Sequence, residues 1–268
     1  MTVSPDSLIK SRERKMSPHG TAYCDVGEGE VLVLIHGVGM RLEAWAPQID
    51  TFSLTHRVIA VDMPGHGKSS YIDENARLPD FVQWFGRFLA DLSLQNISVA
   101  GHSMGALIAE GAAAELSDRV RRVALLNGVY KRDAASRSAV VKRAREIENG
   151  KVDIVSPIER WFGDDPANAP IVGVVRNWLA GVDIRGYATA YRAFSEGDDV
   201  YADCWPSVTM PSLFITGSDD PNSTPQMSID MAAATQNGTA VIIEGHRHMV
   251  NLTAFEKVNQ IMKKWLDN

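Results

Sequence analysis

The serine at position 103 stands in a setting where its hydroxyl could act as a nucleophile. It lies in the string Gly101-His102-Ser103-Met104-Gly105, between the apolar run 97–100 and the run 106–116, which is rich in helix-forming residues. This pattern is typical of a sharp turn from a strand into a helix that lifts the serine above a sheet. Because such a turn brings strand and helix close together, we expect both glycines to be steric necessities. An ordinary glycine-rich turn is the alternative, and the strand–helix context favours the nucleophile.

A serine hydroxyl is a weak nucleophile at neutral pH and needs a histidine base that is itself oriented by a carboxylate. Candidates for both follow strand-like runs: Asp219 and Asp220 come after the run 211–216, and His246 and His248 come after the run 240–244. Open parallel sheets bind their ligands at the carboxyl ends of the strands, so all three roles are available at one edge. The residues alone do not show which aspartate is the acid or which histidine is the base.

Two further strings resemble those of the α/β-hydrolase superfamily. One is His36-Gly37-Val38-Gly39 after the strand-like run 31–35, and the other is Asp62-Met63-Pro64-Gly65-His66-Gly67-Lys68-Ser69, which has the form D-x-P-G-H-G-x-S. With the turn around Ser103, they extend the resemblance from about Thr21 to the end of the chain.

The resemblance implies roles for particular residues. Ser103 is the nucleophile, Asp220 is the acid because it lies three residues past Gly217, and His248 is the base because it lies three residues past Gly245. Asp219 and His246 remain the alternative acid and base. If they have neither role, we interpret Asp219 as a turn residue and His246 as a loop or rim histidine.

The same resemblance places an oxyanion hole beside the serine. Its two donors are the backbone N–H groups of Met104 and, from the loop after the first strand, Val38. We interpret His36 as a structural hydrogen-bonding residue beneath that loop. We interpret Asp62 as a structural carboxylate that fixes the turn Gly65–Gly67, since it precedes the serine in the chain.

Strand-like and helix-like runs alternate along most of the chain, which predicts an α/β fold with a mostly parallel central sheet and helices on both faces. The strand-like runs are 31–35, 57–61, 97–100, 120–126, 211–216 and 240–244, and the helix-like runs include 78–94, 104–116, 226–235 and 253–266. The alternation breaks between 129 and 206, where the resemblance implies an inserted helical lid. We therefore divide the chain into a polar N-terminal tail (1–20), a core (21–128 and 207–268) and a lid (129–206). The tail is either disordered or lies across the body.

The lid segment carries large aromatic side chains that could form the apolar wall of a substrate pocket. We expect a few of them to face the serine, and the candidates are Trp161, Trp178, Tyr187, Tyr191 and Phe194. If the substrate carries a carboxylate, Arg192 or Arg176 is expected to pair with it. The other basic residues of the segment, from Lys131 to Arg145, are interpreted as a solvated helix face rather than an anion-steering patch.

The composition of the chain excludes some classes of binding partner. The net charge is −6 and the isoelectric point is about 5.6, which argues against nucleic acid. There is no apolar run long enough to span a membrane and no secretory pattern in the first twenty residues, and Cys24 and Cys204 lie far apart, so we expect a cytoplasmic protein with free thiols. No cofactor or metal motif is visible. The expected partner is a small-molecule substrate, and a homodimer is left open.

A serine at position 103 argues against the dehalogenase branch of the superfamily, which uses a carboxylate there. The main hypothesis is hydrolysis of a small carboxylic ester or lactone through an acyl-enzyme. The segments 186–194 and 248–252 resemble the lid and histidine loop of 3-oxoadipate enol-lactonases and related small-ester hydrolases. The alternatives are carbon–carbon bond hydrolysis of ring-cleavage products, a cofactor-free perhydrolase, and a ligand receptor with slow turnover.

Overall fold

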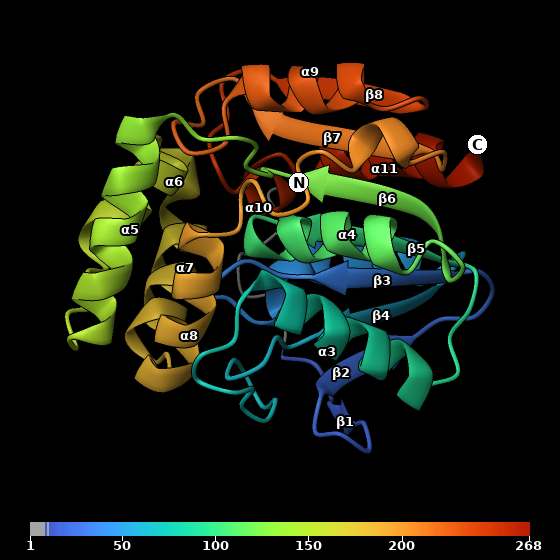
Figure 1. Cartoon of the computed structure of the whole chain (residues 1–268), viewed down its shortest axis with the longest axis horizontal. Coiled ribbons are helices and arrows are strands. Elements are labelled where there is room, and N and C mark those ends of the chain that lie inside the picture. The colour runs from blue at the N-terminus through green and yellow to red at the C-terminus, as the bar shows by residue number, and fades with distance from the viewer. Residues whose placement is uncertain (1–8, 10) are drawn as a thin grey trace.

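The computed structural model describes residue 9 and residues 11–268. In this part of the chain, eight strands form one sheet in the order β1-β2-β4-β3-β5-β6-β7-β8 (Figure 1). Strands β1 and β2 pair antiparallel with their neighbours, and the strands from β3 to β8 all run parallel. The strands are β1 Lys15–Met16, β2 Ala22–Val26, β3 Val31–Ile35, β4 Arg57–Val61, β5 Ile97–His102, β6 Val120–Leu126, β7 Ser212–Gly217 and β8 Gly238–Ile243.

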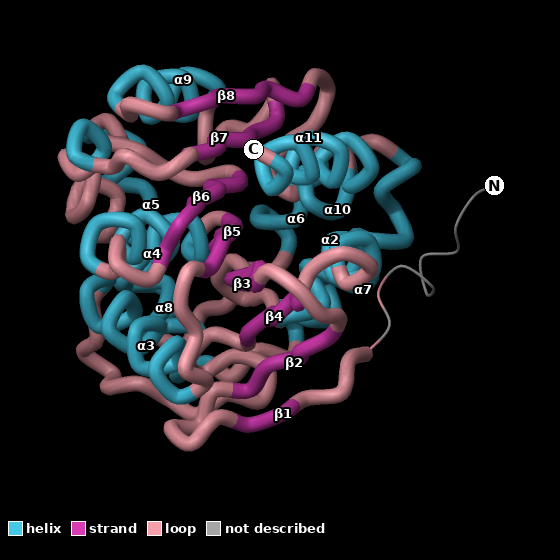
Figure 2. The backbone as a smooth tube through the Cα atoms, turned by 90° about the vertical axis from the view of Figure 1, so that its right-hand side faces the viewer, coloured by secondary structure: helices cyan, strands magenta, loops and turns pink. Residues whose placement is uncertain are grey.

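Both faces of the sheet are covered, which explains why the central strands are continuous apolar runs. In β3, Val33 and Ile35 pack into the core on one face, whereas Leu32 and Leu34 pack into the core on the other. Figure 2 shows α3, α4 and α9 on one side of the sheet and α2 and α11 on the other. These helices are α2 Ala46–Phe52, α3 Leu78–Asp91, α4 Met104–Glu115, α9 Pro225–Ala234 and α11 Phe255–Asp267. The predicted α/β architecture is confirmed.

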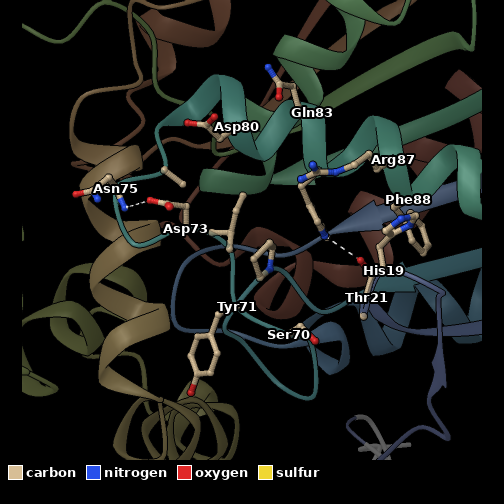
Figure 3. Close-up of a pocket in the computed structure, with 15 residues that line it drawn as sticks. His19, Thr21, Ser70, Tyr71, Asp73, Asn75, Asp80, Gln83, Arg87 and Phe88 are labelled. Atoms are coloured by element: carbon tan, nitrogen blue, oxygen red, sulfur yellow. Dashed lines mark hydrogen bonds between the residues drawn. The ribbon is translucent and has the colours of Figure 1, made fainter.

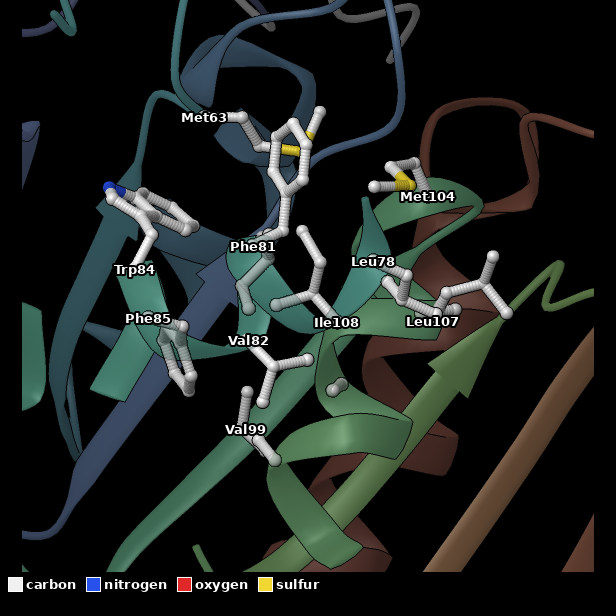
Figure 4. Close-up of a cluster of buried hydrophobic side chains, with 14 of the residues drawn as sticks. Met63, Leu78, Phe81, Val82, Trp84, Phe85, Val99, Met104, Leu107 and Ile108 are labelled. Carbon is white, nitrogen blue, oxygen red and sulfur yellow. The ribbon is translucent and has the colours of Figure 1, made fainter. Parts of the chain in front are cut away.

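Helices α3 and α4 pack closely on the first face (Figure 4). The apolar residues of α3 recur at helical spacing, among them Leu78, Phe81 and Phe85, so they form one buried stripe. Helix α4 presents small residues to it. A Cβ atom on Gly111 would lie 2.4 Å from the Val82 side chain, so the glycine permits the close approach of the two helices.

Between β6 and β7 the chain forms four helices: α5 Ala134–Glu148, α6 Val155–Phe162, α7 Ala169–Ala180 and α8 Ile184–Ser195. They lie together at the carboxyl ends of the parallel strands (Figure 1). Helices α6 and α7 pack through Ile158, Val175 and Leu179 against Met40 and Met249, which follow β3 and β8. The insertion therefore covers the edge of the sheet where the candidate residues were expected.

The described part of the segment 1–20 lies against the body of the protein; the remaining positions, 1–8 and 10, are outside the described residues. Lys15 and Met16 form the edge strand β1, which the sequence did not predict, and the partly buried Arg14 side chain lies between two buried carboxylates. Its guanidinium donates to both oxygens of Glu43 at 2.7 Å and to Asp62 Oδ2 at 2.7 Å. Asp62 also accepts hydrogen bonds from the amides of Leu42 and Lys68.

These contacts explain the ionisation of Asp62 and confirm its predicted structural role. Burial opposes the charged form, but the hydrogen bond from Arg14 and the backbone donors hold the pKa of Asp62 below its ordinary value of 3.8. A Cβ atom on Gly67 would lie 2.1 Å from Asp62 Oδ2, so the turn wraps directly around this carboxylate.

We predict that Arg14→Gln lowers the free energy of unfolding at pH 7 by about 3–5 kcal/mol, because it leaves two buried carboxylates without their cation. The ionised form of Asp62 stabilises the fold above its ordinary pKa, and this contribution is lost as the pH falls through the lowered value. The difference between variant and wild type should therefore be full at pH 7 and shrink as the pH falls towards and below 3.8. Urea unfolding across this pH range measures it.

Lys15→Gln is the matched control, since Lys15 pairs with Asp25 at the exposed edge of the sheet. Equal, small losses for Arg14→Gln and Lys15→Gln would show that the N-terminal segment is not fastened by this ion pair.

Candidate active site

Ser103 lies on a strained turn between β5 and α4. Its φ and ψ are 55° and −114°, a left-handed conformation that side chains rarely adopt. A Cβ atom on Gly101 would lie 1.9 Å from the carbonyl oxygen of Gly105, and one on Gly105 would lie 2.2 Å from the carbonyl oxygen of Ile35. No side chain fits at either position, so the prediction that both glycines are steric necessities is confirmed.

Asp220 and His248 meet beneath this turn. His248 Nδ1 lies 2.8 Å from Asp220 Oδ2, and both side chains are buried. The carboxylate also accepts from the side chain of Asn127 at 2.8 Å and from the amide of Asn222 at 2.8 Å. Burial works against ionisation, but His248 and these donors hold the pKa of Asp220 below its ordinary value. Because Asp220 is ionised, His248 Nδ1 donates to it, which leaves Nε2 as the basic nitrogen.

The alternatives from the sequence lie elsewhere. Asp219 is exposed and accepts a hydrogen bond from Ser218 Oγ at 2.7 Å, as a turn residue does. His246 is partly exposed, with Nδ1 2.9 Å from Thr253 Oγ1. The structure therefore brings Asp220 and His248, not Asp219 and His246, into one hydrogen-bonded pair.

Two supporting residues escaped the sequence analysis. Asn127, directly after β6, donates to the same oxygen of Asp220 that His248 contacts, and its place at the carboxyl end of a strand was the available signal. His102 Nε2 lies 2.8 Å from the carbonyl oxygen of His248. Burial, with a further contribution from His248, lowers the pKa of His102 to about 3, so the ring is neutral and donates to that carbonyl. His102 thus links the turn at Ser103 to the loop that carries His248.

The loop after β3 lies directly against the serine. A Cβ atom on Gly37 would lie 3.1 Å from Ser103 Cβ, and Val38 lines the same cavity as Ser103. Met104 is the first residue of α4, so its amide has no partner within the helix. These positions suit a pair of oxyanion donors.

His36 holds this loop from below and does not reach the cavity. Its Nδ1 lies 2.7 Å from the carbonyl oxygen of Gly37, and its Nε2 accepts from the amide of Met63 at 3.0 Å. Burial, together with the neighbouring His66, lowers the pKa of His36 to about 3, so it stays neutral. The structural role predicted for it is confirmed.

Ser103 and His248 open into a cavity of about 540 Å³ between the sheet and the inserted helices. Its apolar wall includes four aromatic residues of α6 and α8, namely Trp161, Tyr187, Tyr191 and Phe194. The ring of Trp161 stacks on that of His248, with the centroids 5.9 Å apart and the planes at 26°. The inserted segment therefore contacts the histidine itself.

Three of the predicted pocket residues do not line this cavity. Trp178 lines a separate cavity of about 120 Å³ beside Gly39 and His66. Arg192 pairs with Glu148 at 3.3 Å and also donates to the carbonyl oxygen of Glu74. Successive residues of a helix are turned by about 100°, so Arg192 points away from the cavity that Tyr191 faces. Arg176 is exposed on α7.

The interpretation of the basic residues 131–145 as a solvated face is wrong for part of the segment. Arg132 and Arg143 line the cavity, as does Arg160 of α6. Arg143 could not be distinguished in the sequence from Lys142 and Arg145, which are close to it on the same helix and are exposed.

A second large cavity, of about 490 Å³, lies beside Pro64 and the loop before α3 (Figure 3). His19 and Thr21 precede β2, Tyr71 and Asp73 come from the loop before α3, and Arg87 comes from α3. Neither Ser103 nor His248 lines it. Within residue 9 and residues 11–268, no group of three or more His, Cys, Asp or Glu side chains is placed to hold a metal ion, and no helix is long and apolar enough to cross a membrane.

Comparisons with known proteins show which family this chain resembles. The model of the alpha/beta hydrolase family matches residues 32–261. The (E)-2-((N-methylformamido)methylene)succinate hydrolase of Acinetobacter baylyi is 51% identical over 258 residues, which cover 96% of this chain and 98% of that protein.

More distant relatives extend the comparison. The 3-oxoadipate enol-lactonase 1 of the same organism is 29% identical over 234 residues, 86% of each chain. The crystal structure of the enol-lactonase from Burkholderia xenovorans superposes with a TM-score of 0.85 at 24% identity, covering 96% of this chain and all of that one. At that identity the match concerns the fold alone.

We predict that Ser103→Ala lowers kcat at least about 10³-fold while the protein remains folded, because it removes the nucleophile and leaves the buried Asp220–His248 pair intact. Labelling with a fluorophosphonate probe, with circular dichroism as the folding control, measures this. A wild-type protein that is not labelled, or a Ser103→Ala variant that still is, would contradict the assignment.

The neighbouring residues supply a second prediction with built-in controls. His248→Ala and Asp220→Asn should each lower kcat by about 10³-fold or more, since each removes a member of the buried pair. His246→Ala and Asp219→Asn should change it little. Steady-state kinetics on the four variants decides between the pairs, and the reverse order of losses would exchange the assignments.

Proposed function

The chain belongs to the alpha/beta hydrolase family, and from that premise we propose that it hydrolyses a small, open-chain, unsaturated carboxylic acid through an acyl-enzyme on Ser103. It is a hydrolase, like the two relatives from Acinetobacter baylyi named above. The observation that carries the proposal is the Asp220–His248 hydrogen bond at the floor of the cavity that Ser103 lines. The assignment of the substrate draws on the relative with 51% identity.

The mechanism that we propose follows from the geometry. Ser103 Oγ attacks a substrate carbonyl as His248 Nε2 takes the hydroxyl proton, and the amides of Met104 and Val38 stabilise the oxyanion. His248 then returns the proton to the leaving group, which departs and leaves an ester on Ser103. Water, deprotonated by the same histidine, hydrolyses this ester. Asp220 keeps Nδ1 protonated throughout and balances the charge of the imidazolium.

The substrate class is drawn from the name of that relative. The named compound carries two carboxylates, a carbon–carbon double bond and an N-formyl group. Carboxylates are poor electrophiles, so in such a molecule the serine would attack the formyl carbon. The nitrogen that leaves is conjugated through the double bond with a carboxylate, which stabilises its departure.

The name of this relative places the alternative hypothesis from the sequence ahead of the main one. The alternative, carbon–carbon hydrolysis of ring-cleavage products, fits the 51% identical relative better than simple ester or lactone cleavage does. In both the named compound and a ring-cleavage diketone, the leaving atom is conjugated with an unsaturated acid. We therefore propose a carbonyl joined to a conjugated nitrogen or carbon as the reactive group. Esters and lactones become secondary substrates.

We also propose that the segment 129–206 acts as a lid that sets substrate choice. Its residues Trp161, Tyr187, Tyr191 and Phe194 wall the cavity, whereas Ser103 and His248 come from the sheet edge. The chemistry and the selection of substrate would thus reside in different parts of the chain.

We predict that kcat/KM for (E)-2-((N-methylformamido)methylene)succinate exceeds that for p-nitrophenyl acetate by about 100-fold or more, because a site built for polar groups strongly rejects analogues that lack them. A panel that adds an enol-lactone and a vinylogous diketone acid measures the preference, and Ser103→Ala is the control for each substrate. Faster turnover of the neutral ester than of every unsaturated acid would restore the ester hypothesis. A single acylation without turnover of any compound would point to a receptor.

A further inference from the structure

The cavity beside Ser103 is rich in cationic side chains, although the protein as a whole carries a net charge of −6. Two of its basic residues already have a counter-ion: Lys131 Nζ lies 2.7 Å from Asp203, and the buried Arg132 lies 2.9 Å from Asp198. These two charges are therefore compensated within the protein.

Arg143 and Arg160 differ from them. In the described part of the chain, neither guanidinium has a carboxylate within 4.0 Å. Arg143 donates to the hydroxyl of Tyr191 at 3.1 Å. The Nε atom of Arg160 is buried and has no hydrogen-bond partner among the described residues.

The acidic residues nearby are engaged elsewhere. Asp133 accepts from the amide of Ser136 at 2.7 Å, and Asp230 accepts from Gln226 at 2.7 Å. Asp153 lies near enough to influence Arg160 electrostatically, but it accepts hydrogen bonds from the amides of Val155 and Ser156. None of these carboxylates neutralises the two arginines.

Two like charges without a counter-ion are unfavourable in a partly buried site. Burial, and then repulsion from Arg143, lowers the pKa of Arg160 from its ordinary value. Planar guanidinium groups bind carboxylates through paired charge-assisted hydrogen bonds, and such bonds are stronger away from water. An anion bound in the cavity would supply the negative charge that the two arginines lack. Its oxygens would also accept the hydrogen bonds that the guanidinium groups do not make within the protein.

We propose that Arg143 and Arg160 bind the two carboxylates of a dicarboxylic substrate, with Tyr191 holding Arg143 in place. The proposal rests on the proposed function, since it assumes that the anion binds in the cavity where Ser103 reacts. The two arginines come from α5 and α6, so they would bind the acid end of the substrate from the side of the inserted helices. The reactive carbonyl would then lie near Ser103, at the carboxyl ends of the strands. A monocarboxylate could engage only one of them well.

Direct binding of succinate tests this without catalysis. Isothermal titration of the wild type should give a dissociation constant for succinate at least about tenfold below that for butyrate. Arg143→Gln and Arg160→Gln should each weaken succinate binding about 10- to 100-fold, the usual range for losing a hydrogen bond to a charged group. Arg176→Gln, which removes an exposed charge from α7, should leave the succinate affinity unchanged.

A melting curve without ligand separates binding from a structural role. Because Arg160 Nε has no partner and the residue is repelled by Arg143, Arg160→Gln should not lower Tm. Any loss of kcat/KM for p-nitrophenyl acetate should be at least about tenfold smaller than the loss of succinate affinity.

Each contrary outcome is decisive. Succinate binding that is absent from the wild type, or unchanged in both variants, overturns the proposal even if the triad is active. Parallel losses of Tm, ester turnover and succinate binding would make the arginines structural and overturn it as well. If succinate binds through the arginines but Ser103 turns over no substrate, the binding site stands and the proposed hydrolysis fails.

Discussion

The turn at Ser103 holds three backbone segments closer together than any side chain would permit. Gly101 of β5 faces the Gly105 carbonyl in α4, and Gly105 faces the Ile35 carbonyl at the end of β3. This close approach fixes the serine, the start of α4 and the loop after β3 relative to one another. The left-handed conformation of Ser103 is the strain that accompanies it, and the packing of α4 between α3 and the sheet opposes its relaxation. The position of the candidate nucleophile is thus a property of the whole core.

Around that fixed point, the charges are arranged in two contrasting ways. On the sheet side two buried carboxylates are paired and hydrogen-bonded: Asp220 has His248 and Asn127, and Asp62 has Arg14. On the side of the inserted helices, Arg143 and Arg160 face the cavity without a carboxylate among the described residues. A paired charge gives a rigid, preorganised group, whereas an unpaired charge gives affinity for a ligand. The division matches our proposal that reaction and recognition lie in separate parts of the chain.

Much of the fold and of the core of the site was predictable because it depends on local patterns. Buried parallel strands are apolar runs, and the turn at Ser103 and its strand–helix context are contiguous in sequence, so β3 to β8 and the conformation of this turn were predicted correctly. Strands β1 and β2 and the anchoring of Arg14 were missed because they depend on contacts between distant residues. The same limit explains Arg192, Trp178 and Arg143: the sequence shows which residues lie on a helix, but not which face meets the cavity. The preference for ester cleavage likewise rested on a resemblance to other hydrolases, whereas our proposal of an unsaturated dicarboxylate draws on the name of the relative with 51% identity.

The central claim is that Ser103, activated by His248, carries the acyl group during turnover. Acid-quenched protein, digested and analysed by mass spectrometry during steady-state hydrolysis of p-nitrophenyl acetate, tests it most directly. We expect an acetyl ester on the peptide that contains Ser103, and a burst of p-nitrophenol released before the steady state as this ester forms. An acetyl group on another residue, or turnover with neither a burst nor an adduct, would contradict it.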